Sequence, residues 1–320
     1  MTTLTRQLTI PPEWAGTRFD KVATELLDEF SRVEITRWIR EGSLTLDGDA
    51  SLPKNKVKGG ESILLQAERT EREAWQEPQA LEFEIVEEND DFLVINKPPG
   101  LVVHPGAGNH SGTLVNGLLH HRPSLSKLPR AGIVHRLDKD TSGLMVVAAN
   151  LATHRTLVET VAARTMHRQY FALCEGRMIA GQDIELAIGR DPRSRTRQAV
   201  LQEGKYAFTE VRVEERFRIH TLVRAKLSTG RTHQIRVHLS HVGFPLVGDS
   251  RYGARRKLPT GADEVLREQL RGFPRQALHA QELGFPHPRD QSWMQYSAAM
   301  PADMSDVIKA LRADVEIDGS

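Results

Sequence analysis

The stretch over residues 132–147, GIVHRLDKDTSGLMVV, holds one histidine, one arginine, one lysine and two aspartates between two short apolar runs. Apolar runs of this length are typical of strand ends that are buried in a sheet. The two carboxylates are Asp138 and Asp140, and a carboxylate placed there can act as a nucleophile or as a general base. The stretch therefore indicates a carboxylate-based site. The residue types alone leave open which aspartate does the work.

A second charged cluster, TGRTHQIRVHL, covers residues 229–239. It follows an apolar strand expected over 222–227, and a helix is expected to begin near Thr232. This pattern puts Arg231 at a strand-to-helix corner, where functional side chains are common. If Arg231 meets Asp138, a bidentate guanidinium–carboxylate pair would hold the acid ionised and oriented. An ordinary buried ion pair would give the same pattern.

Other site chemistries fit the sequence poorly. The glycines of residues 106–112 have the spacing G-x-G-x-x-x-G, which differs from a dinucleotide fingerprint. The stretch 135–138 lacks the spacing of a kinase catalytic loop, and the Asp-Thr-Ser-Gly of 140–143 lacks the second copy that an aspartic protease needs. His238 and His241 would share a helix face, but no H-E-x-x-H motif occurs. We therefore expect a site without metal or nucleotide cofactor.

Composition places limits on the class of protein. The chain has 320 residues, which suggests roughly two domains, and a formal net charge of only +1. Any affinity for nucleic acid must therefore come from local basic clusters. The N-terminus lacks the apolar segment of a signal peptide, and no stretch is long enough to span a membrane. The single cysteine, Cys174, lies in an apolar stretch and is expected to be buried. These features favour a soluble cytoplasmic protein without a membrane partner.

The first part of the chain has the pattern of a small separate domain over residues 16–66. Thr17 is a suitable N-cap for a helix with apolar residues at helical spacing, and a second helix is expected over 31–41 with Gly42 as its stop. Short strands are expected at 44–46 and 63–65, with a turn at Asp47-Gly48. Basic side chains gather on the helices and the connecting loop, where a merely solvated surface is the alternative interpretation.

Residues 67–80 are charged and are predicted to be a linker, and residues 81–320 are predicted to form one larger α+β domain. The apolar pattern predicts strands at 82–87, 92–96, 144–149, 169–174 and 221–227, and helices near 113–121, 151–163 and 232–242. Helices and strands that alternate irregularly argue against a regular βαβ repeat.

The segments GTRFDKVATELL and SRVEITRWIREGSLTLDG resemble an S4 domain, a small α-L RNA-binding fold. The resemblance implies that the second helix and the adjoining loop contact the RNA backbone, which positions RNA without reading its sequence. The residues that would make these contacts are Arg18, Lys21, Arg32, Arg37, Arg40, Lys54, Lys56 and Lys58.

The segments HRLDKDTSGLMVVA and GRTHQIRVHL resemble the RluA family of pseudouridine synthases. Further segments resemble family blocks in the expected order, namely DFLVINKPPGLVVHPG, HRQYFALCEG, PLVGDSRYG and RQALHA. The resemblance runs from about residue 80 to the C-terminus. It implies a catalytic domain built on a mixed, largely antiparallel β-sheet that is flanked by helices.

The resemblance also implies roles for four residues. Asp138 matches the catalytic aspartate, and Arg136 matches the arginine that occupies the duplex space left by an extruded uridine. Tyr170 matches the tyrosine stacked on the target base, and Arg231 matches the basic partner of the aspartate. The reaction breaks the N1–C1′ bond of uridine and forms a bond from C5, so it requires no cofactor. Asp138 as nucleophile at C1′ and as base at C2′ both remain open.

Similarity to the members of this family that act on the large ribosomal subunit implies 23S rRNA as partner, within it the stem-loop helix 69, and the assembling subunit. We expect a monomer. A basic loop is expected against rRNA phosphates, unless it is only solvated, and its residues are Arg190, Arg193, Arg195 and Arg197. The open alternatives are another large-subunit or tRNA substrate, a non-catalytic RNA-binding or ribosome-assembly factor, and a carboxylate-dependent hydrolase.

Overall fold

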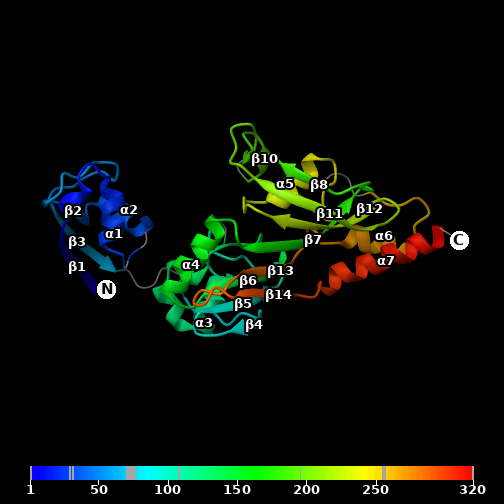
Figure 1. The fold of residues 1–320 in the computed structure, drawn as a ribbon, viewed down its shortest axis with the longest axis horizontal. Coiled ribbons are helices and arrows are strands. Elements are labelled where there is room, and N and C mark those ends of the chain that lie inside the picture. Colours follow the sequence, from blue (N-terminus) through cyan, green and yellow to red (C-terminus); the bar gives the residue numbers. More distant parts are fainter. Residues whose placement is uncertain are drawn as a thin grey trace. The chain divides into compact units, whose positions relative to one another are not determined.

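The computed structural model describes residues 2–28, 30, 32–69, 77–106, 109–194, 196–253 and 257–318 (Figure 1). The chain divides into two compact units, Met1–Glu77 and Pro78–Ser320. The boundary between them falls within the predicted linker 67–80. Several predicted features lie outside the described residues, namely Ser31 in the second helix, linker residues 70–76, residues 107 and 108, and Arg195.

The first unit is a three-stranded antiparallel sheet in the order β1-β3-β2, packed with two helices. Its elements are β1 (Thr2–Thr9), a 3-10 turn (Pro12–Trp14), α1 (Phe19–Leu26), α2 (Arg32–Glu41), β2 (Leu44–Leu46) and β3 (Ser62–Arg69). Phe19, Ile35 and Leu65 are among its fully buried core residues. The sequence did not predict β1, which pairs with β3 over its whole length and puts the start of the unit well before residue 16.

The start of α1 differs from the prediction, because its N-cap is Arg18 and not Thr17. The N–H of Phe19 donates to the carbonyl of Asn55 at 2.7 Å, and that of Asp20 donates to the carbonyl of Pro53 at 3.1 Å. A distant loop therefore satisfies donors that a capping side chain would otherwise take.

In the part of the chain that the structure describes, nine strands of the second unit form one sheet in the order β4-β5-β6-β13-β7-β12-β11-β8, with β14 on β13. Strands β6 and β13 run parallel, and their other neighbours are antiparallel. Its strands are β4 (Glu84–Glu88), β5 (Phe92–Lys97), β6 (Ser142–Ala148), β7 (His167–Glu175), β8 (Gln182–Glu185), β11 (Phe208–Arg216), β12 (His220–Leu227), β13 (Leu278–Pro286) and β14 (Trp293–Ser297). The mixed, largely antiparallel sheet of the predicted α+β fold is confirmed.

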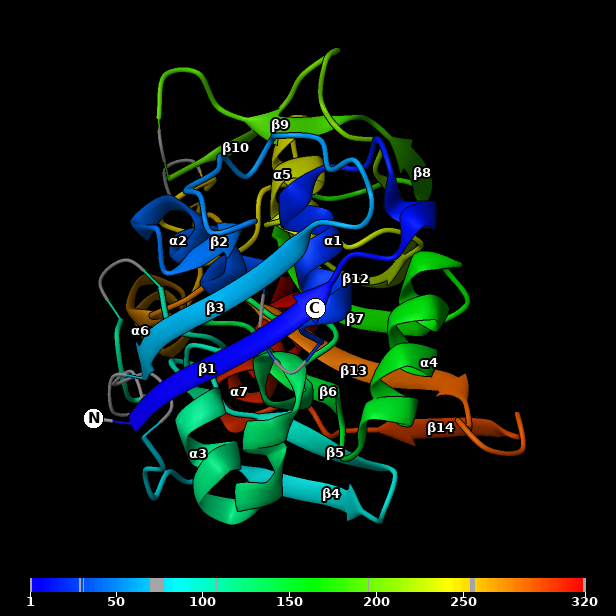
Figure 2. The ribbon, with the colours of Figure 1, turned by 90° about the vertical axis from the view of Figure 1, so that its left-hand side faces the viewer.

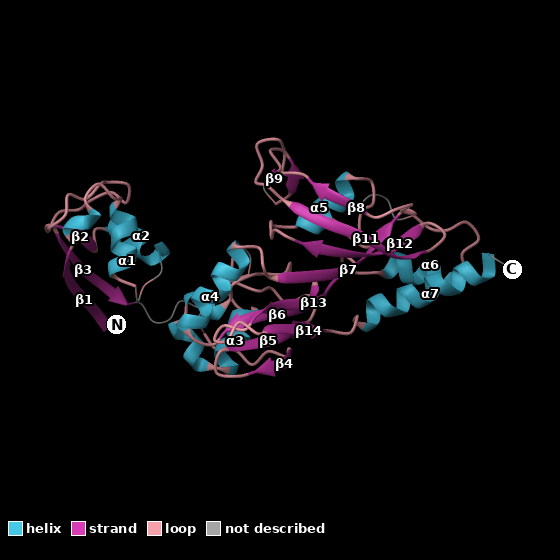
Figure 3. Cartoon of the chain, viewed as in Figure 1, coloured by secondary structure: helices cyan, strands magenta, loops and turns pink. Residues whose placement is uncertain are grey.

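Helices surround this sheet, and a separate two-stranded hairpin extends from it (Figure 3). The helices are α3 (Leu114–His121), α4 (Leu151–Ala162), α5 (Gln234–His241), α6 (Glu264–Gly272) and α7 (Ala302–Asp318), with 3-10 turns at Pro123–Lys127 and Pro129–Gly132. The hairpin consists of β9 (Ile188–Arg190) and β10 (Gln198–Val200). Figure 2 shows this hairpin at the end of the unit opposite to β4 and α3.

The predicted strands correspond to β4, β5, β6, β7 and β12, and the predicted helices of this unit correspond to α3, α4 and α5. Cys174 on β7 is buried, as predicted. Burial raises the pKa of its thiol far above the usual value, which leaves it protonated and unreactive.

Gly143, in the stretch of ionisable residues, pairs with Ala280 where β6 meets β13. Its φ is 115°, and a Cβ built on it would lie 2.2 Å from the carbonyl oxygen of Ala280. Only glycine fits both the backbone conformation and the space. The Thr-Ser-Gly that follows Asp140 therefore starts a central strand.

We expect the substitution Gly143→Ala to destabilise the second unit by about 2–4 kcal/mol, because it combines backbone strain with a steric clash. Gly272→Ala is the matched control, since nothing lies within 4 Å of a Cβ at that position and its φ is not positive. Denaturant unfolding measures both variants. Equal stabilities of the two variants would contradict this account of Gly143.

Candidate active site

Asp138 lies in the segment that leads into β6, and two buried basic side chains hold the turn after it. Lys97 Nζ donates to the carbonyl of Lys139 at 2.9 Å, and Arg275 Nη1 donates to the carbonyl of Asp140 at 3.0 Å. The N–H of Thr141 donates to the carbonyl of Asp138 at 3.1 Å. The backbone that carries Asp138 is therefore fixed by hydrogen bonds to its own carbonyl and to those of the next two residues.

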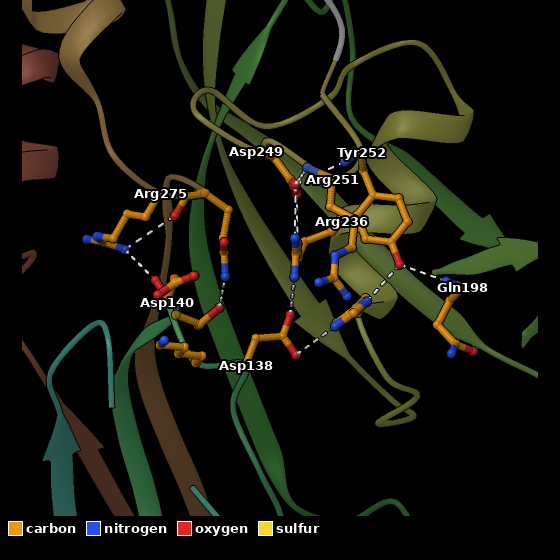
Figure 4. A network of polar contacts seen from close by, with 12 residues as sticks. Asp138, Asp140, Gln198, Arg236, Asp249, Arg251, Tyr252 and Arg275 are labelled. Carbon is orange, nitrogen blue, oxygen red and sulfur yellow. Dashed lines mark hydrogen bonds and ion pairs between the residues drawn. The ribbon is translucent and has the colours of Figure 1, made fainter. Parts of the chain in front are cut away.

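The carboxylate of Asp138 takes part in an ion network that is centred on Arg236 (Figure 4). Arg236 Nη1 donates to Asp138 Oδ2 at 2.8 Å, while its Nε and Nη2 donate to the two oxygens of Asp249 at 2.7 and 2.9 Å. The side chain of Asp249 is fully buried, whereas that of Asp138 keeps 16% of its surface exposed. One guanidinium thus bridges a buried carboxylate and an accessible one.

Burial and ion pairing shift the pKa values of the groups in this network in opposite directions. Burial alone would raise the pKa of Asp249, but hydrogen bonds from Arg236 and from the N–H groups of Tyr252 and Arg251 hold that pKa below its usual value. Burial disfavours the charge of Arg236, yet Asp249 and Asp138 together raise its pKa above the usual value. Asp138 therefore faces a partner that is always charged.

The prediction that Arg231 pairs with Asp138 is wrong. Arg231 Nε donates to the carbonyl of Tyr206 at 2.9 Å, and its backbone N–H donates to the side chain of Gln234 at 3.0 Å. Helix α5 begins only at Gln234, because His233 takes a left-handed conformation with φ 57°. Arg231 thus lies before the turn that redirects the chain, while Arg236 lies within the buried helix.

A signal for Arg236 was present in the sequence. It lies within QIRVHL, and every residue from Gln234 to Leu239 is buried. An arginine inside a buried helix requires an anionic partner, because arginine is almost never fully buried unless it is paired.

His233 connects the carboxylate of Asp138 to Tyr252. Its Nε2 lies 3.9 Å from Asp138 Oδ1, and its Nδ1 lies 2.7 Å from the hydroxyl of Tyr252. That hydroxyl accepts a hydrogen bond from the backbone N–H of Gln198 at 2.8 Å, so its own proton is available for Nδ1 of His233. Burial lowers the pKa of His233, which favours the neutral ring. This pattern assigns the remaining ring proton to Nε2, on the side of Asp138.

The structure buries Tyr170 and leaves Arg136 exposed. Tyr170 is on β7 and is buried, and this burial raises the pKa of its phenol to about 12, so it is neutral. The positive charge of Arg168 lowers the pKa of this phenol, and the negative charge of Asp138 raises it. Arg136 is exposed, Leu137 is buried, and Asp138 is partly exposed.

Comparison with known proteins decides the family. The model of the family described as RNA pseudouridylate synthase matches residues 91–241, which include Asp138, Tyr170 and Arg236. A ribosomal large subunit pseudouridine synthase D of Xanthomonas campestris pv. campestris is 48% identical over 309 residues, covering 97% of this chain and 93% of that protein. The enzyme of the same name from Pseudomonas aeruginosa is 47% identical and is covered to 97%. The chain belongs to the RNA pseudouridylate synthase family.

Solved structures agree on the fold of this family. Human RNA pseudouridylate synthase domain containing 4 covers 72% of this chain with a TM-score of 0.57 at 24% identity, and 93% of that chain is covered. Human RNA pseudouridylate synthase domain containing 1 covers 74% with a TM-score of 0.52 at 26% identity, and 98% of that chain is covered. The protein is an RNA pseudouridine synthase, and the network around Asp138 is its candidate active site.

The basic residues predicted for this synthase fall into two groups, one in each unit. In the first unit, Arg18 and Arg32 both bind the buried carboxylate of Asp20 at 3.0 Å, so part of their charge is neutralised internally. Arg37 is half-buried, and the other predicted residues are exposed, namely Lys21, Arg40, Lys54, Lys56 and Lys58.

In the second unit, Arg190, Arg193 and Arg197 are exposed on the β9–β10 hairpin. The guanidinium of Arg197 lies over the ring of Tyr252, 5.3 Å from its centre, and that of Arg236 lies 5.0 Å from the same centre. The hairpin is therefore in direct contact with the network around Asp138.

Among the described residues, no group of three or more histidine, cysteine or acidic side chains is arranged to hold a metal ion. Within the same residues, no helix has both the length and the apolar character that a membrane span requires.

We expect Arg236→Gln to lower the rate of isomerisation at least about 100-fold, because it leaves two carboxylates without the cation between them. Arg231→Gln is the matched control, since it removes a hydrogen bond to a carbonyl worth about 1 kcal/mol, and we expect a loss below about tenfold. Release of tritium from C5-labelled uridine in RNA measures both rates. The reverse order of the two losses would restore Arg231 as the partner of Asp138.

Proposed function

We propose that this protein isomerises uridine to pseudouridine in ribosomal RNA, with Asp138 as the catalytic aspartate. The observation that carries the proposal is the Asp138 carboxylate, which stays partly exposed and is ion-paired through one oxygen to the buried Arg236. The names of the relatives, which are 46–49% identical to this chain, support the large ribosomal subunit as the source of the substrate.

The geometry leaves one carboxylate oxygen for the sugar. Arg236 occupies Oδ2, while Oδ1 lies 3.9 Å from His233 Nε2, which is beyond hydrogen-bond distance. An oxygen in this position can bond to C1′ or remove the proton from C2′. In both cases the uracil must leave the stack and rotate, which requires a pocket with an aromatic face.

Tyr170 and Arg136 would serve this flipping step. A buried, neutral phenol offers a flat apolar surface on which the extruded base can stack. An exposed arginine two residues before the catalytic aspartate can enter the space that the base leaves in the RNA.

The substrate that we propose is helix 69 of 23S rRNA in the assembling large subunit, bound by a cytoplasmic monomer. Relatives named synthase D match over nearly the whole chain, which favours this substrate over that of a synthase C or a tRNA. The first unit would act as an S4 domain, because its exposed basic residues suit contacts with the RNA backbone.

The two other classes of function fit the site less well. A ribosome-assembly factor without catalysis would have no use for a buried arginine that orients an accessible carboxylate. A hydrolase would need a second acid beside Asp138, but Asp249 is fully buried and occupied by Arg236.

We expect Asp138→Asn to reduce pseudouridine formation at least about 1,000-fold, because an amide is neither a nucleophile nor a base. Affinity for rRNA should change less than about threefold. Asp140→Asn is the control, since the hydrogen bond that holds Asp140 in the turn goes to its backbone carbonyl. Mapping of pseudouridine in 23S rRNA from deletion cells that carry each variant measures the outcome. Normal modification with Asp138→Asn would refute the assignment.

We expect the triple substitution of Arg190, Arg193 and Arg197 by glutamine to flatten the dependence of RNA affinity on salt. Each phosphate contact contributes about 0.7–0.9 to the slope of log affinity against log salt, so the slope should fall by about 2–3. A matched triple variant at the exposed residues Arg177, Arg271 and Lys309 should leave the slope unchanged. Equal slopes for wild type and hairpin variant would mean that the hairpin is only solvated.

A further inference from the structure

Arg168 is a buried arginine for which the described residues provide no partner. It lies on β7 two residues before Tyr170, so both side chains are on the same face of the strand. Only 5% of its surface is exposed, and its Nε is buried without a hydrogen-bond acceptor. In the described part of the chain, no carboxylate forms an ion pair with it. Because buried charges are normally paired, such a group indicates that the partner is a ligand.

The surroundings of Arg168 belong to the site. Its charge acts on Tyr170 and on His135, which lies three residues before Asp138. Burial, helped by this charge, lowers the pKa of His135 to about 3, so that ring is neutral and supplies no countercharge. On the other side, Arg168 Nη1 would lie only 2.9 Å from a Cβ at Gly230, in the loop between β12 and α5. The guanidinium therefore lies between the predicted base-stacking residue and the loop that leads to Arg236.

The reaction creates a negative charge at the base. When the N1–C1′ bond breaks, its electron pair stays on the uracil, which becomes an anion with charge spread over N1, O2 and O4. C1′ is compensated by a bond to the Asp138 carboxylate, or by loss of the C2′ proton to it. C5 then bonds to C1′ as the Asp138–C1′ bond breaks or, on the other route, as C2′ regains its proton from Asp138. The C5 proton leaves and N1 gains a proton, so the overall composition is unchanged. A cation close to the base lowers the barrier to the first step.

The other cation of the site is already committed. Arg236 uses Nε, Nη1 and Nη2 for Asp249 and Asp138, and the phenol of Tyr170 is neutral. Arg168 has no such commitment. Since it is 95% buried, a base that enters beside Tyr170 can reach it, whereas a backbone phosphate would remain at the surface.

We propose that Arg168 is a catalytic residue that donates hydrogen bonds to a carbonyl oxygen of the flipped uracil and stabilises the uracil anion formed when the glycosidic bond breaks. This role rests on the proposed function of the site.

Single-turnover kinetics on an rRNA stem-loop test the proposal with Arg168→Gln and Arg168→Lys. We expect Arg168→Gln to lower the rate of isomerisation about 100- to 1,000-fold with RNA affinity within about threefold of wild type, and Arg168→Lys to lose less. Arg177→Gln is the control for removal of an exposed charge. If affinity and its salt slope fall while the single-turnover rate stays, Arg168 binds a phosphate and the proposal is overturned.

A change of the leaving group separates stabilisation of the anion from a structural role, because a structural role of Arg168 would give the same rate loss with both substrates. Fluorine at C5 makes the departing uracil a weaker base, so it needs less help from a cation. The loss caused by Arg168→Gln, measured as formation of rearranged product, should therefore be at least about tenfold smaller with 5-fluorouridine in the RNA. An equal loss with both substrates would contradict stabilisation of the anion.

Gly230→Ala tests the same guanidinium without removing its charge. The backbone at Gly230 is not left-handed, and Arg168 supplies the only atoms within 4 Å of the added Cβ, so the variant should fold but displace the guanidinium. We expect a rate loss of about tenfold or more in the wild-type background and none in the Arg168→Gln background. Additive losses would overturn the proposal. A wild-type protein that fails to isomerise uridine would instead refute the proposed function.

Discussion

The structure around the site depends on one buried guanidinium that is shared by two carboxylates. Arg236 and Asp138 are 98 residues apart in the sequence, and Arg236 and Asp249 are 13 apart, yet three short hydrogen bonds join them. Taking these charges out of water costs several kcal/mol per ion, and the cost is offset only when every donor and acceptor is matched. The turn before β6, helix α5 and the loop after it must therefore come together in one arrangement.

The rest of the second unit supports that arrangement and keeps an acidic and a basic group of the site apart from each other. Lys97 and Arg275 fix the turn behind Asp138, and Gly143 lets β13 pack against the strand that follows. In the mechanism that we propose, the carboxylate of Asp138 serves the sugar. Arg168, which has no ion-pair partner among the described residues, lies two residues before Tyr170 on the same face of β7. A negative group for the sugar and a positive group for the base match the separation of charge as a glycosidic bond breaks.

Much of the fold could be predicted from local patterns. Runs of apolar residues predicted β5 and β6, and apolar residues at helical spacing predicted α3 and α4. Helix α7 also has its buried residues Met304, Val307, Ile308 and Leu311 at helical spacing, so periodicity could have revealed it. By contrast, β13 contains the polar residues His279, Gln281 and Glu282 and shows no regular alternation of apolar and polar residues. Its pairing is decided by its neighbours on both sides, β6 and β7.

The spacing of residues and the family resemblance already pointed to the residues that we propose for the chemistry: Asp138 in its cluster, Tyr170 on a strand, and a second basic cluster. The partners became visible only in three dimensions: Arg236 binds Asp138, Asp249 completes the network, and Arg168 has no acceptor for its Nε among the described residues. The reason is geometric. A left-handed residue at His233 sets where α5 begins, and hence which arginine faces inward. Pairing between distant segments cannot be read from the local spacing of either one.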